Sequence, residues 1–83
     1  MPRFFFHLHN SMGVACDDEG REAASPEAAR LLAMEDARSL IGEEAKEGCV
    51  DLRGRIEVHD AQGRHLLTVN FADAVELKLA RDR

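Results

Sequence analysis

The pattern of apolar and polar positions predicts a β-strand over residues 3–9. Three consecutive phenylalanines occupy its first half, and successive aromatic residues disfavour a helix and pack well on a pleated surface. Alternation assigns the side chains to two faces, Phe4, Phe6 and Leu8 to one and Phe5, His7 and His9 to the other. We expect the first face in the core, whereas the second combines one apolar ring with two imidazoles.

A long amphipathic helix is predicted over residues 25–47. Ser25 is a typical N-cap, and Pro26 suits the first helical position. Apolar residues recur along one side at helical spacing: Ala29, Leu32, Ala33, Ala37, Leu40 and Ile41. Gly48 is the expected end of the helix, and an earlier end or bend at Gly42 is the alternative.

Two D-x-x-G sequences, Asp17–Gly20 and Asp60–Gly63, predict tight turns that end in a left-handed residue. We expect a short hairpin around the first turn and the main hairpin, residues 55–70, around the second. A three-residue loop sets the register of the main hairpin as His59 with His65, Val58 with Leu66 and Ile56 with Thr68. This register turns Leu67 and Val69 toward the face that the helix does not cover.

The complete pattern predicts one α+β domain over residues 1–83. Its sheet has three to four mainly antiparallel strands, packed by one long amphipathic helix. After a break at 71–74, residues 75–79 alternate strictly between apolar and charged, which favours a short final strand, although the same residues are good helix formers. A chain of 83 residues buries only about 60–65% of its unfolded surface, so a partner subunit, a metal or a disulfide would add needed stability.

Composition and charge narrow the classes of partner. Apolar residues make up 45% of the chain and charged residues 33%, which is typical of a globular protein. The net charge is −5, and residues 1–50 carry five Lys or Arg against ten Asp or Glu. We therefore expect no direct nucleic acid ligand, because such proteins present a basic surface.

The sequence contains no apolar run long enough for a membrane span or a secretion signal. We therefore expect no membrane association and a cytoplasmic location. In that compartment Cys16 and Cys49 would stay reduced, and we interpret both as small buried residues. A disulfide between them would form only if the fold brings the two residues close together.

Several motifs, taken in order, resemble a family of short bacterial proteins of unknown function. The motifs are Pro2–His7, Asp18–Gly20, the Ala-rich helix from Glu27, Ile56–Asp60 with Gly63, and Val69–Val75. The resemblance spans nearly the whole chain and implies a bacterial cytoplasmic α+β module with no established active site. A weaker, fold-level resemblance to HicB-type antitoxin domains covers roughly the first half, but the chain lacks their Pro-and-Gly turn before the helix and any obvious DNA-binding appendage.

A metal site is one hypothesis for the first strand. His7 and His9 stand two residues apart, so both imidazoles leave the same face, and Cys16, Asp17 or Asp18 would complete the ligand set. The simpler interpretation is a polar strand edge, since structural metal sites usually show four ligands. The second pair, His59 and His65, has the same two interpretations.

No residue pattern indicates catalysis, and we expect neither an enzyme nor a cofactor. A nucleophilic cysteine needs a base beside it, and no flanking motif frames either thiol. The acidic residues Asp17 to Glu19 are explained by the turn that they occupy. Three arginines near the main hairpin would suit an anion, but a solvated hairpin flank is the preferred interpretation: Arg53, Arg55 and Arg64.

The leading functional hypothesis is a homodimer formed through the uncovered sheet face. We expect Phe5, Leu67 and Val69 there, and apolar residues on such a face call for a partner. The alternative is that residues 71–79 fold back over this face. The predicted function is a non-enzymatic binding or regulatory module acting through protein–protein contact, and the alternative is a metal-binding protein using the two histidines of the first strand.

Overall fold

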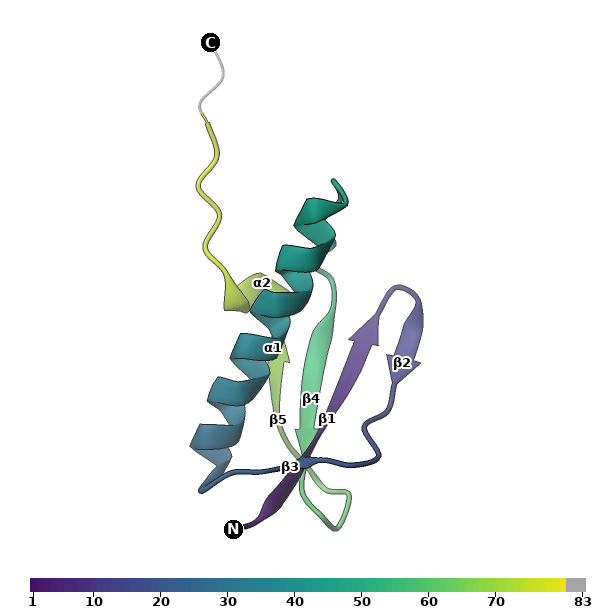
Figure 1. Cartoon of the computed structure of the whole chain (residues 1–83), viewed down its shortest axis with the longest axis vertical. Helices are drawn as coiled ribbons and strands as arrows, with labels where there is room; N and C mark the ends of the chain where they lie inside the picture. Colours follow the sequence, from purple (N-terminus) through teal and green to yellow (C-terminus); the bar gives the residue numbers. More distant parts are fainter. Residues whose placement is uncertain (81–83) are drawn as a thin grey trace.

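The computed structural model describes residues 1–80 and has the expected α+β fold, in which an antiparallel sheet packs against one long helix (Figure 1). The elements are β1 (Arg3–Asn10), β2 (Gly13–Ala15), β3 (Arg21–Glu22), α1 (Pro26–Lys46), β4 (Arg55–His59), β5 (His65–Asn70) and α2 (Phe71–Ala74). The strand order is β2-β1-β4-β5, and β3 pairs with β1 as well. All these pairings are antiparallel.

Helix α1 begins at the predicted signals. The Ser25 hydroxyl accepts the backbone N–H of Ala28 at 3.1 Å, and Pro26 follows in the first turn. The helix continues through Gly42 and ends just before Gly48, whose φ of 91° is the left-handed conformation typical of a helix end. It packs on β4, β5 and α2, which leaves β1 and β2 beside it rather than beneath it (Figure 1).

The first predicted hairpin is wrong, because β2 and β3 do not pair with each other. Each pairs instead with a different half of β1: β2 with Leu8–Asn10, and β3 with Arg3 and Phe4. The loop between β2 and β3 spans the gap, and the carboxylate of Asp17 accepts the N–H of Phe6 at 3.0 Å. A side chain thus supplies the hydrogen bond that a continuous edge strand would have made.

The main hairpin has the predicted turn but a different register. His59 pairs with His65 as expected, and Gly63 has a φ of 80°. A β-bulge then intervenes, so that Val58 lies opposite Leu67 rather than Leu66. The bulge places Leu66 on the surface, where it is 40% exposed. Every following residue in β5 therefore faces the side of the sheet opposite to the predicted one.

The core lies between α1 and one face of the sheet. Its buried side chains come from every major element, namely Phe4, Phe6, Ala23, Ala29, Ala33, Ala37, Ile56, Val58, Val69, Phe71 and Ala74. The contribution of α1 consists of alanines, so the helix approaches the sheet closely. Within residues 1–80 no helix has the length and apolar character needed to cross a membrane.

Residues 71–74 form the short helix α2, and the chain then becomes extended. Val75 has φ −135° and ψ 154°, and residues 76–80 adopt neither helix nor strand. The sequence left a short strand and a helix open for residues 75–79, and the structure has neither of them there. Figure 1 shows this part of the chain leaving the body beyond α2.

Candidate functional site

The sheet face opposite α1 carries all four histidines of the chain. His7 and His9 come from β1, His59 from β4 and His65 from β5. The His59 ring lies between two others in edge-to-face contacts, with centroids 4.7 Å from that of His7 and 5.6 Å from that of His65. The pairing of β1 with β4 brings His7 near His59, and the pairing of β4 with β5 places His65 opposite His59.

Glu57 organises the polar groups on this face. Its Oε1 lies 3.5 Å from His9 Nε2 and 3.3 Å from His59 Nε2, and its Oε2 accepts from Arg55 Nε at 3.0 Å. Arg55 lowers the pKa of Glu57, and the hydrogen bond to His59 lowers it further. The carboxylate is therefore a charged hydrogen-bond centre that holds its neighbours in fixed positions.

The four predicted metal ligands do not converge. His7 and His9 share a face as predicted, but His7 Nδ1 accepts the backbone N–H of Asp17 at 3.0 Å. The carboxylate of Asp17 is directed to backbone donors, and Cys16 is exposed. Among residues 1–80 no group of three His, Cys, Asp or Glu side chains has the arrangement of a metal site.

Asp17 closes the edge of β1 instead. Its Oδ2 accepts from Phe6 N at 3.0 Å, and its Oδ1 accepts from Gly20 N at 3.1 Å and from Glu19 N at 3.2 Å. Partial burial on its own would raise the pKa of Asp17, but these three donors and the nearby His7 together lower it below its ordinary value. The residue is thus a structural carboxylate within the loop.

The prediction that Phe5, Leu67 and Val69 share one apolar patch is also wrong. Phe5 lies on the open face beside His59, as expected. Val69 is a core residue, only 4% exposed, and Leu67 is partly buried and packs against the core on the same face. The cause is the bulge at Leu66, which exchanges the two faces of β5 and allows these apolar side chains to be buried.

The prediction that both cysteines are buried is wrong. Cys16 and Cys49 are both exposed and both free. Cys49 follows the end of α1 and lines a cavity there, so its thiol is accessible from solvent.

A groove runs between α1 and β1. It consists of two cavities of about 430 and 310 Å³ that share Leu8 and Leu40. The first cavity extends to Phe71 and Cys49, and the second extends along α1 to Asp36. We call this feature the α1–β1 groove.

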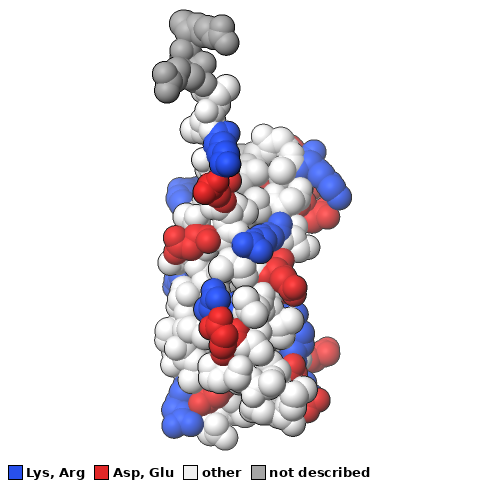
Figure 2. Space-filling view, turned by 90° about the vertical axis from the view of Figure 1, so that its left-hand side faces the viewer, with Lys and Arg blue, Asp and Glu red and all other residues white. Residues whose placement is uncertain are grey.

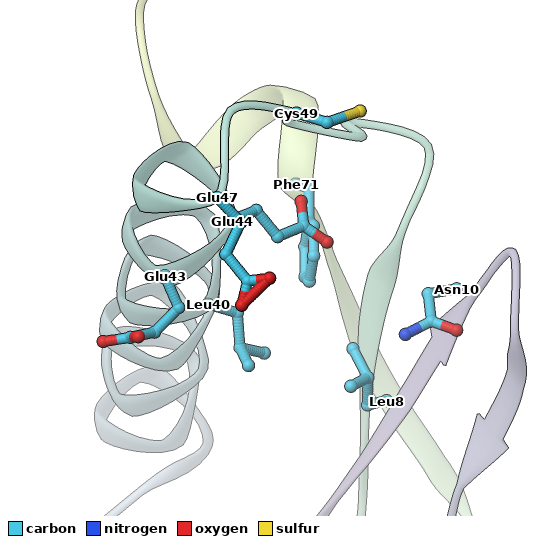
Figure 3. A pocket seen from close by; sticks show the side chains of 8 residues that line it. All are labelled: Leu8, Asn10, Leu40, Glu43, Glu44, Glu47, Cys49 and Phe71. Carbon is cyan, nitrogen blue, oxygen red and sulfur yellow. The ribbon is translucent and has the colours of Figure 1, made fainter.

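The floor of the groove is apolar and its rim is acidic. Figure 3 shows Leu40 of α1 and Leu8 of β1 on opposite walls of the first cavity, with Phe71 behind them. The carboxylates of Glu44 and Glu47 extend over this cavity from the end of α1 (Figure 3). The arrangement suits an apolar group that is accompanied by positive charge.

The extended residues 75–80, which we call the outer segment, expose apolar side chains. Leu77 is 62% exposed and Leu79 is 86% exposed. The Cα radius of gyration is 14.1 Å, against about 12 Å for a compact chain of this length. Figure 2 shows acidic and basic groups interspersed over one face of the body and the outer segment protruding from it.

Sequence reasoning missed the groove and did not predict that the outer segment would extend from the body. The alternation from Val75 to Leu79 was the available signal for the segment. The groove had no local signal, because it depends on which strands α1 covers. The expectation that residues 71–79 fold back over the open face is wrong, since α2 packs against α1 and β5.

Comparison with known proteins gives a family but no activity. The family model described as a domain of unknown function matches residues 3–72, which include β1, α1 and both strands of the main hairpin. No curated protein and no solved structure matches the chain. The match confirms the resemblance noted from the motifs, and the chain belongs to this family, Domain of unknown function (DUF6894).

Proposed function

We propose that this protein is a non-enzymatic binding module that acts through protein–protein contact and self-associates as a homodimer. The observation that supports this function is the outer segment, in which Leu77 and Leu79 stand 62% and 86% exposed. Large apolar side chains on an extended segment gain free energy when a partner covers them. A second copy is the partner considered first, since symmetric dimers are the commonest assembly.

The placement of the charged groups favours binding over catalysis. The carboxyl groups with lowered pKa values lie in turns, on the open face and, for Glu27, in the first turn of α1, and each is explained by its hydrogen bonds. The groove is lined mainly by apolar side chains and by carboxylates at its rim. Such a surface recognises a peptide segment by shape and charge.

The test is the molar mass in solution, measured by light scattering after size exclusion at several concentrations. We expect twice the 9.2 kDa chain mass for the parent protein, with and without a chelator. A Leu77→Asp/Leu79→Asp variant should have the mass of one chain. Leu31→Asp is the matched control, because Leu31 is 52% exposed on α1, and this variant should remain dimeric.

A parent protein that is monomeric at every concentration would refute the proposed self-association. A dimer that persists in the double aspartate variant would show that another surface associates. Dissociation by the chelator would assign the association to a metal instead.

A further inference from the structure

We infer that the outer segment of one chain docks in the α1–β1 groove of a second copy, and that the exchange is reciprocal. This inference rests on the self-association proposed above and names the two surfaces that meet. Each copy has one segment and one groove, so a two-fold dimer would fill both grooves and leave no open site.

The lengths of the two surfaces agree. The groove follows α1 from Asp36 to Glu47, a distance of about 17 Å at 1.5 Å per residue. The outer segment has six residues outside any helix or strand, and six residues span about 20 Å when extended at 3.3 Å per residue. The segment is therefore long enough to occupy both cavities at once.

The apolar groups also correspond. Leu77 and Leu79 are two residues apart, so an extended backbone directs both to the same side. The groove offers Leu8, Leu40 and Phe71 as an apolar floor. Leu40 is 37% exposed in the single chain, and docking would cover it together with the two leucines of the segment.

Charge complementarity selects this occupant. Glu44 and Glu47 stand at the rim, where the C-terminal end of α1 adds a partial negative charge. Lys78 of the outer segment lies 3.4 Å from Glu76 of the same segment, and the sequence adds the basic residues Arg81 and Arg83 after it. Residues 75–83 carry three basic and two acidic groups, whereas the chain as a whole has a net charge of −5.

The direction of the segment indicates a second copy rather than its own groove. Phe71 of α2 lines the first cavity, but the chain turns outward after Ala74 and continues away from the body (Figure 1). The leucines therefore lie outside the surface from which the segment starts. A neighbouring molecule can receive them without any change in the fold of either body.

Disulfide trapping tests the docking, because Cys49 already lines the groove and is exposed. Leu77→Cys and Leu79→Cys would be made separately in a Cys16→Ser background and oxidised with oxidised glutathione. A disulfide requires Cα atoms within about 7 Å. Leu31→Cys is the matched control, since Leu31 is 52% exposed on α1 and lines neither cavity of the groove.

We expect a covalent dimer for at least one of the two segment variants, with peptide mass spectrometry locating the bond to Cys49. It should form roughly tenfold faster than in the Leu31→Cys control, because docking raises the effective concentration of the thiols. Reduction should return single chains, and an added Cys49→Ser change should abolish the product.

The other outcomes separate this inference from the proposed function. A parent that is dimeric by light scattering but gives no bond to Cys49 would overturn the groove and leave the dimer. A bond between two segment cysteines would overturn the groove in the same way. A bond within one chain would show that the segment returns to its own groove, and a monomeric parent would remove both proposals.

Discussion

Replacing Asp17 by Ala should destabilise the fold by about 2–3 kcal/mol. The change removes the acceptor of three backbone N–H groups, those of Phe6, Glu19 and Gly20. The N–H of Phe6 lies in the gap between the pairings of β2 and β3 with β1, and a donor left unsatisfied costs about 1–3 kcal/mol. The two loop donors can turn to water and add less.

Urea unfolding followed by far-ultraviolet circular dichroism measures this loss, because the chain has no Trp or Tyr for fluorescence. For a domain of this size, the expected change lowers the melting temperature by about 10–20 °C. Asp18→Ala is the matched control: this neighbouring side chain is exposed, and the change should cost under about 0.5 kcal/mol. Equal stability of the two variants would refute the assigned role of Asp17.

The pH dependence gives the same argument a second test. The folded protein lowers the pKa of Asp17 below its ordinary value of 3.8. The carboxylate therefore contributes its full stabilisation above about pH 4 and loses it as the pH falls through the folded pKa. The difference in unfolding free energy between the parent and Asp17→Asn should be constant at pH 5–7 and should narrow below pH 4. A difference that does not change with pH would contradict the pKa assignment.

Two further pairs of substitutions test the packing, with urea unfolding as the measurement. Val58→Ala leaves a cavity at a residue that is 0% exposed and should lower the free energy of unfolding by about 2–3 kcal/mol. Val50→Ala, at a residue that is 41% exposed, should lower it by under about 1 kcal/mol. Gly54→Ala would bring a Cβ to 3.0 Å from the Phe71 ring and should cost about 1–3 kcal/mol. Gly42→Ala meets nothing within 4 Å on α1 and should instead stabilise the protein by about 1 kcal/mol. A stabilising Gly54→Ala together with a destabilising Gly42→Ala would contradict the described packing.

The parts of the fold that follow from local chemistry could be predicted from the sequence. The start of α1 depends on Ser25 and Pro26, and the turn of the main hairpin depends on Gly63, so neighbouring residues alone determine each. The register of β5 is different. Leu66 and Leu67 are adjacent and equally apolar, and only the space beneath α1 decides which one is buried.

The candidate site was predicted in part for the same reason. The alternation of the first strand predicted that His7 and His9 share one face, and the structure confirms this prediction. Their partners come from β4, and the sequence did not indicate that Glu57 would lie between the rings of His9 and His59. Asp17 was assigned to a turn and to a metal, while its main role is to cap a strand edge, which requires knowledge of where β2 ends.

The groove itself follows from the composition of α1. The helix contacts the sheet through Ala29, Ala33 and Ala37, all 0% exposed, and small side chains allow the helix axis to lie close to the strands. The helix contacts β4 and β5 extensively, and Leu40 of α1 and Leu8 of β1 line an open cavity. The alanines that make the core compact therefore also set the position of α1 beside the groove.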